Sequence, residues 1–175
     1  MVKRSGQRVR PVAVRRVSWF VQYAHNYDRI CHHLGNALLH EPQLDLIERF
    51  GGTVVVHDVL LSDLLWALQR TERRPQALTR ALFASHGWPA LVDLHERGAE
   101  AAVRTWPASA SILRHADGLI VSSDYARRWM QRLLGYGPTG ESDKSSTSAP
   151  LELATVPLPQ AITAEAATAA RQERR

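Results

Sequence analysis

Cysteine is nearly absent from this chain, since Cys31 is the only one in 175 residues. A single cysteine excludes an intramolecular disulfide and any Cys-x-x-Cys metal or redox motif. The chain is therefore not a disulfide-stapled secreted scaffold, and a reducing compartment is the expected location.

Long apolar runs are also missing. No stretch approaches the roughly 18 residues of a membrane-spanning helix, and the apolar patch at 17–21 is interrupted by Ser18. We expect neither a signal peptide nor a transmembrane helix.

Acidic residues are absent from residues 1–16, which carry six Lys and Arg side chains. The whole chain has a formal net charge of +5, so residues 17–175 sum to −1. The segment has no interleaved aromatic residues and no groove-reading motif, which argues against a nucleic-acid-binding platform. We expect a basic, disordered leader over 1–16, which could still bind phosphates or anionic lipid weakly.

The remaining composition, 45% hydrophobic and 22% charged, is that of one soluble globular domain. Three apolar segments, at 29–33, 53–56 and 119–121, are each followed by a turn and a stretch of helical periodicity. This order predicts an α/β fold. The unbroken run Thr53–Val56 is typical of a fully buried strand, which favours a parallel sheet.

The predicted helices cover 41–50, the stretch from Val59 onward, and 124–134. A helical insertion is expected at 72–107 and a flexible Gly/Ser/Pro-rich loop at 135–150. A further strand is predicted near 153–156, and an Ala-rich helical tail at 161–175. The core domain is thus expected to span residues 17–160.

Cys31, His32 and His33 raise the question of a zinc site. Neighbouring side chains on a strand point to opposite faces, so Cys31 and His33 alone could share a site, and the sequence identifies no further ligands. We predict no metal. The structural alternative is a strand with Cys31 buried as a small apolar residue.

His57 and Asp58 lie where the clearest strand ends, at the sheet edge where open α/β folds bind ligands. An imidazole there could donate a hydrogen bond to a sugar hydroxyl or to developing charge, while Asp58 could orient the ring. The structural alternative is that Asp58 caps the following helix.

These residues resemble the amino-terminal domain of bacterial family 4 glycosyltransferases. No single motif is specific, and the resemblance rests on the order of the stretches that carry it: 27–36 (YDRICHHLGN), His40, 52–58 (GTVVVHD), 114–123 (RHADGLIVSS) and 155–159 (TVPLP). The resemblance implies one Rossmann-like half of the two-domain GT-B fold, with a parallel sheet and flanking helices. It also implies metal-independent, retaining transfer from a nucleotide-sugar held by the other half.

By the same resemblance, His57 and Asp58 would be catalytic, with His57 facing the donor sugar. Gly35 and Asn36 would form the acceptor-side rim, and His40 and Ser123 would bind substrate, Ser123 also opening a helix beside the cleft. The family's amino-terminal Gly-rich loop and its nucleotide-sugar domain have no counterpart in this sequence.

We therefore expect a partial glycosyltransferase that is inactive alone and has no cofactor of its own. Its expected partners are a glycan or lipid-linked acceptor and a complementary donor-domain polypeptide. The alternative is a non-catalytic binding or interaction module on a degenerate glycosyltransferase scaffold. The expected location is the cytoplasm, with attachment to the inner membrane face left open.

Overall fold

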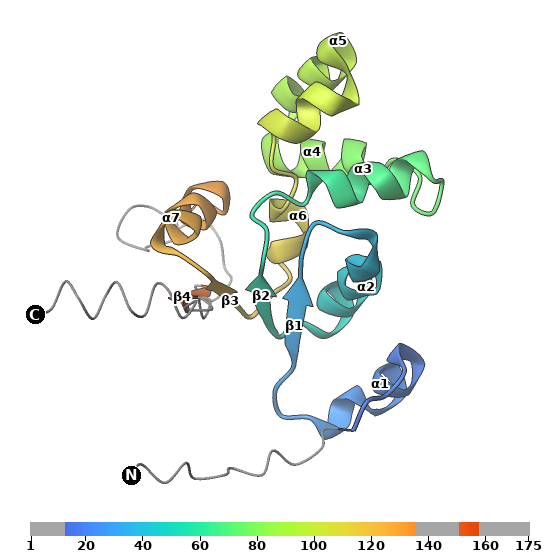
Figure 1. The fold of residues 1–175 in the computed structure, drawn as a ribbon, viewed down its shortest axis with the longest axis vertical. Coiled ribbons are helices and arrows are strands. Elements are labelled where there is room, and N and C mark those ends of the chain that lie inside the picture. The colour runs from blue at the N-terminus through green and yellow to red at the C-terminus, as the bar shows by residue number, and fades with distance from the viewer. Residues whose placement is uncertain (1–12, 136–150, 158–175) are drawn as a thin grey trace, which may run out of the picture.

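The computed structural model describes residues 13–135 and 151–157, which form a parallel sheet with flanking helices (Figure 1). The elements in chain order are α1 (Val17–Tyr23), η1 (Ala24–Asn26), β1 (Cys31–Leu34), η2 (Leu38–His40), α2 (Glu41–Phe50), β2 (Thr53–Val56), α3 (Ser62–Arg70), α4 (Ala77–His86), α5 (Trp88–Thr105), α6 (Ala110–Leu113), β3 (Gly118–Val121), α7 (Asp124–Leu133) and β4 (Glu152–Thr155). The predicted α/β class is confirmed, and the architecture is Rossmann-like.

The four strands are all parallel and lie in the order β1-β2-β3-β4. Leu34, Val56, Val121 and Thr155 share one row of the register, and His33, Val55, Ile120 and Ala154 share the row before it. Right-handed crossovers that always step in the same direction place the helices that pack on a sheet against one of its faces. The burial of alternate side chains follows from this, with the Leu34 row against the helices and the His33 row more exposed.

The core lies between the sheet and the helices. Its largest fully buried side chains are Leu34, Ile47, Leu61, Leu64, Leu68, Leu78, Leu82, Leu113, Leu119, Met130, Val54 and Val121. Helix α2 packs against β1 and α6, whereas α7 packs against β3 and β4. Helices α3, α4 and α5 lie beyond the carboxyl ends of the strands (Figure 1).

Helix α2 and strand β2 have the boundaries that the sequence predicts. Pro42 lies in the first turn of α2, where its missing N–H costs nothing. Gly51 ends the helix at φ 63°, a left-handed conformation that favours glycine. Its neighbour Gly52 donates its backbone N–H to the Asp117 carboxylate at 2.7 Å, which ties this turn to the start of β3.

Helix α3 begins at Ser62 rather than near Val59, so the predicted start is three residues early. Residues 59–61 form a non-helical link in which Leu61 is fully buried and the Val59 carbonyl accepts a hydrogen bond from the Ser109 hydroxyl. The insertion contains α4 and α5 as expected, and α5 is interrupted at Gly98, which has φ 82°.

A buried, apolar position for Cys31 was the alternative to a zinc ligand, and the burial pattern of β1 contradicts it. Cys31 is exposed and His32 is buried. The ring of His32 is satisfied there: Nε2 donates to the Gly51 carbonyl at 2.9 Å, and Nδ1 lies 3.0 Å from the Gln43 side-chain amide. A histidine whose two ring nitrogens both find partners can replace an apolar residue at a buried position.

Val55 is only partly buried, so β2 is not the fully buried strand expected.

Parts of the predicted organisation lie outside the described residues: leader residues 1–12, loop residues 136–150 and the tail 161–175. Across residues 13–135 and 151–157, none of the helices combines the length and the apolar character needed to cross a bilayer.

We predict that Leu34→Ala lowers the free energy of unfolding by about 2–5 kcal/mol, because the truncation leaves a cavity under the sheet. Leu39, which is 75% exposed, provides the matched control, and Leu39→Ala should change stability by less than about 0.5 kcal/mol. Urea unfolding followed by circular dichroism measures both. Equal losses for the two variants would contradict the placement of Leu34 in the core.

Candidate functional site

The sequence-predicted residues lie on the loops that leave the carboxyl ends of three neighbouring strands. Gly35 and Asn36 follow β1, His57 and Asp58 follow β2, and Ser123 follows β3. Carboxyl ends of parallel strands meet at the same sheet edge, which is where open α/β folds bind ligands. The structure therefore brings these predicted residues to one edge of the sheet.

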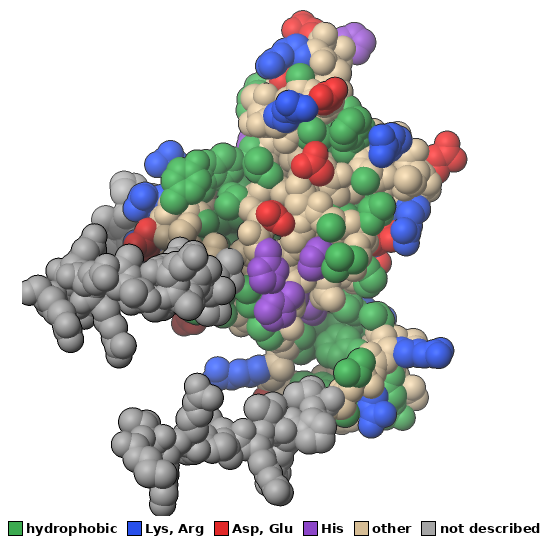
Figure 2. Space-filling model, viewed as in Figure 1, with side chains coloured by type: hydrophobic (Ala, Val, Ile, Leu, Met, Phe, Trp, Pro, Cys, Tyr) green, Lys and Arg blue, Asp and Glu red, His purple; other side chains and the backbone are tan. Residues whose placement is uncertain are grey.

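His57 pairs with a histidine that the sequence reasoning left without a role. His57 Nε2 lies 3.0 Å from His33 Nδ1, and the two ring planes are inclined by 22° with centroids 5.2 Å apart. Both side chains are exposed, and histidines gather on the surface seen in Figure 2. His33 and His57 lie on the same face because His33 pairs with Val55, two residues before His57. The alternation of side chains between the two faces of a strand was therefore the sequence signal that could have identified His33.

Asn36 links the loop after β1 to the loop after β2 and to α3. Its backbone N–H donates to Asp58 Oδ2 at 3.0 Å, and its side-chain amide donates to Asp63 at 2.8 Å. Its Oδ1 accepts the backbone N–H of Leu64 at 2.9 Å, which satisfies a free amide in the first turn of α3. Asn36 therefore caps a helix that begins far along the chain, a contact worth about 1 kcal/mol.

Asp58 does not cap α3, so that structural alternative is wrong. The N-cap position is occupied by Leu61, whose side chain cannot accept a hydrogen bond. The Asp58 carboxylate instead holds the Asn36 backbone through Oδ2, and among the described residues no hydrogen bond to Oδ1 is seen. The group is exposed and one of its oxygens is open to a ligand.

Gly35 lies tightly between His40 and Asp58. A Cβ at Gly35 would come within 2.9 Å of His40 Nε2 and 3.2 Å of Asp58 Oδ2. The His40 ring is held in place by its Nδ1, which donates to the His33 carbonyl at 3.1 Å. His40 therefore supports the loop from behind, and Gly35 permits this close approach because it has no side chain.

Ser123 is the N-cap of α7. Its hydroxyl oxygen accepts the backbone N–H of Ala126 at 3.2 Å, the contact that a capping serine normally makes. Ser123 opens the helix as the resemblance implies, but it does not line the adjoining pocket. Tyr125 and Trp129, in the first and second turns of α7, line it instead.

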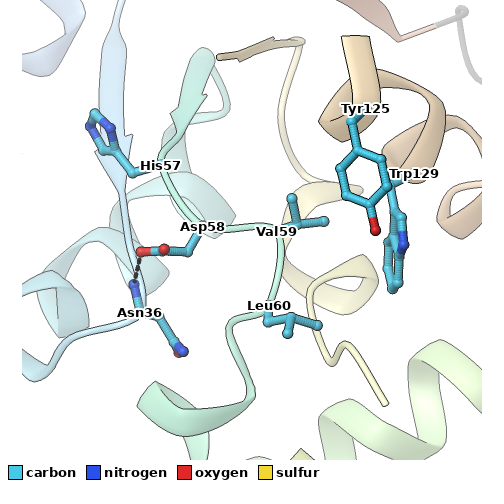
Figure 3. Close-up of a pocket in the computed structure, with 7 residues that line it drawn as sticks. All are labelled: Asn36, His57, Asp58, Val59, Leu60, Tyr125 and Trp129. Carbon is cyan, nitrogen blue, oxygen red and sulfur yellow. Dashed lines mark hydrogen bonds between the residues drawn. The ribbon is translucent and has the colours of Figure 1, made fainter. Parts of the chain in front are cut away.

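The pocket has a volume of about 420 Å³ and is lined by Asn36, His57, Asp58, Val59, Leu60, Tyr125 and Trp129. Figure 3 shows the polar residues on one side and the two aromatic side chains of α7 on the other. The His57 ring is turned towards β1, where it meets His33. The sequence reasoning missed Tyr125 and Trp129, although their spacing of four residues places them on one helix face.

The chemistry available in this pocket is hydrogen bonding and stacking. Among the residues that the structure describes, no three His, Cys, Asp or Glu side chains are arranged to hold a metal ion. The carboxylate and amide of Asp58 and Asn36 can bind hydroxyl groups, and the faces of Tyr125 and Trp129 offer flat apolar surfaces. A ligand with many hydroxyl groups and an apolar face would use both.

We predict that Gly35→Ala destabilises the domain by about 1–3 kcal/mol, because the added methyl group displaces the His40 ring or the Asp58 carboxylate. Placing the same substitution in a His40→Ala background removes the closest contact, so the loss should fall below about 1 kcal/mol. Chemical denaturation of the wild type, the two single variants and the double variant gives the coupling free energy between the two substitutions. Equal losses in both backgrounds would show that His40 does not press on Gly35.

Comparisons with protein-family models, with curated proteins and with solved structures give no match for this chain. The candidate site therefore stands on its geometry, and the family resemblance seen in the sequence remains an expectation.

Proposed function

We propose that this chain is the acceptor-side domain of a retaining, nucleotide-sugar-dependent glycosyltransferase, inactive alone and completed by a donor-domain polypeptide. The observation that carries the proposal is the position of His57, exposed on the wall of a pocket at the carboxyl edge of a parallel sheet. The resemblance of the sequence to family 4 glycosyltransferases adds the reaction type.

The His33–His57 pair supports a donor role for His57. A neutral imidazole has one N–H donor and one acceptor nitrogen. When His33 Nδ1 donates to His57 Nε2, the proton of His57 must lie on Nδ1, which makes no hydrogen bond to another described residue. His57 Nδ1–H is then free to donate to a hydroxyl of the donor sugar, and His33 acts as a positioning residue that fixes the tautomer.

The acceptor would lie in the pocket with its hydroxyl groups towards Asn36 and Asp58. Pyranose rings have apolar C–H faces that suit the aromatic wall formed by Tyr125 and Trp129. In the proposed transfer, the acceptor oxygen bonds to the anomeric carbon as the bond from that carbon to the diphosphate breaks. The hydroxyl proton leaves with the diphosphate, and no metal is required.

The described residues 13–135 and 151–157 form one four-stranded sheet, which in this proposal supplies the acceptor side. The donor nucleotide-sugar would then be held by a second Rossmann-like domain. Nucleotide-sugars are cytoplasmic substrates, so we propose that the reaction takes place there. The acceptor would be a free glycan or a lipid-linked one presented at the inner face of the membrane.

A second candidate function is a non-catalytic binding module on the same scaffold. The observation that favours it is that the His57 ring already contacts His33 and is turned towards β1. In this case the pocket would bind a glycan without transferring sugar to it.

We predict that His57→Ala changes the stability of the folded chain by less than about 1 kcal/mol, because the side chain is exposed. In a complex completed by its donor-domain polypeptide, the same substitution should lower glycosyl transfer by roughly 10²-fold or more. His33→Ala should lower transfer less, because the tautomer of His57 is then no longer fixed but its N–H group is still present.

His95, an exposed histidine on α5, provides the matched control, and His95→Ala should leave transfer unchanged. Transfer is measured with radiolabelled nucleotide-sugars, and folding by urea denaturation of each variant. Glycoside formation by the wild-type chain without a partner would disprove the need for a donor domain. Glycan binding without transfer in the complex would favour the binding module.

A further inference from the structure

A second pocket lies on the far side of Trp129. It has a volume of about 360 Å³ and is lined by Ser85, His86, Pro107, Trp129, Arg132 and Leu133. Trp129 therefore lines both this pocket and the candidate site beside His57. The two hollows are neighbours along one wall.

That wall is a single face of α7. Tyr125, Trp129 and Leu133 follow one another at intervals of four residues, and Arg132 lies beside Leu133, so their side chains form one stripe on the helix. At about 1.5 Å per residue, the stripe from Tyr125 to Leu133 is about 12 Å long. This length exceeds a single hexose ring and suits an elongated ligand.

The opposite wall of the second pocket is held in place by hydrogen bonds within the domain. His86 Nε2 donates to the Pro107 carbonyl at 2.9 Å, and the His86 ring lies against Trp106 with centroids 5.0 Å apart. Arg114 donates to the Ala84 carbonyl at 3.3 Å. The wall is therefore formed before a ligand arrives, which lowers the entropy cost of binding.

The two pockets differ in charge. Asp58 lines the first, whereas the charged residue of the second is Arg132, and no carboxylate lines it. Arg132 is exposed, and it makes no ion pair with a described residue. A guanidinium with this freedom pairs readily with a carboxylate or phosphate.

We propose that the two pockets form one groove along α7 that binds an elongated acceptor of at least two sugar units, with an acidic group beside Arg132. This inference rests on the proposed function and specifies the acceptor class. The reacting hydroxyl lies near Asp58 and His57, Trp129 stacks on the sugar in between, and Arg132 pairs with the acidic group. The acidic group is either the carboxylate of a uronic acid or the phosphate of a phosphorylated saccharide.

The test is a titration of the ¹⁵N-labelled full chain by NMR with three probes: trigalacturonate, maltose 1-phosphate and neutral maltotriose. We expect the amide signals of α7 to shift with an acidic probe at concentrations where maltotriose has little effect. The acidic probe that binds more tightly identifies the source of the acidic group. Added NaCl should weaken its binding, because an exposed ion pair is screened.

Two substitutions with matched controls test the assigned contacts. Arg132→Gln should weaken binding of the acidic probe about threefold to fivefold, and Arg128→Gln, on the same helix but outside both pockets, should not. Trp129→Ala should weaken binding about tenfold, whereas Trp88→Ala, at a 70% exposed position on α5, should leave it unchanged. Trp129→Phe retains the packing of α7 and should give an intermediate loss.

Three outcomes would overturn the proposed groove. The first is that no probe shifts the amide signals of α7, and the second is that neutral and acidic probes bind equally well. The third is that Arg132→Gln and Arg128→Gln have equal effects on binding. The proposed function fails separately: an acidic probe that binds along α7 but accepts no sugar in the completed complex leaves the groove intact and removes the glycosyltransferase role. Conversely, if Arg132→Gln leaves transfer unchanged, the proposed glycosyltransferase role stands and the proposed groove is wrong.

Discussion

The parallel alignment of four strands in chain order is the constraint on which the rest of this domain depends. Four parallel strands in the order β1-β2-β3-β4 place every strand-to-helix loop at the same edge of the sheet. Residues far apart in the sequence, such as Asn36, His57 and Tyr125, come together at that edge for this reason. The candidate site is a consequence of strand order before any side chain is considered.

Side chains then fix the loops that the topology has assembled. Asn36 connects the end of β1 to Asp58 and to the first turn of α3, and Gly35 leaves room for His40 to support the same loop. These polar contacts lie at an exposed edge, so each contributes modestly to stability. Their effect is on geometry, since they hold the loops that carry Asp58 and His57 in one arrangement. A ligand that meets prearranged groups loses less entropy on binding.

The sequence predicted the parts of this fold that local pattern determines. The valine run of β2, Pro42 at the start of α2 and Ser123 before α7 each determine structure over a few neighbouring residues. The start of α3 was predicted wrongly because its cap comes from Asn36, a contact across 28 residues that no local pattern reveals. Asp58, read as a possible cap, holds the Asn36 backbone instead, and Trp129 enters the pocket through the packing of α7 against the sheet.

The most direct test of a preformed site at the carboxyl edge is the hydrogen bond between His33 and His57. NMR of the ¹⁵N-histidine-labelled chain can detect scalar coupling through an N–H···N hydrogen bond. We expect a cross-peak between Nδ1 of His33 and Nε2 of His57, whose separation is 3.0 Å, and we expect His33→Ala to abolish it. Two histidines that show no scalar coupling would contradict the account, because the ends of β1 and β2 would then not present a joined site.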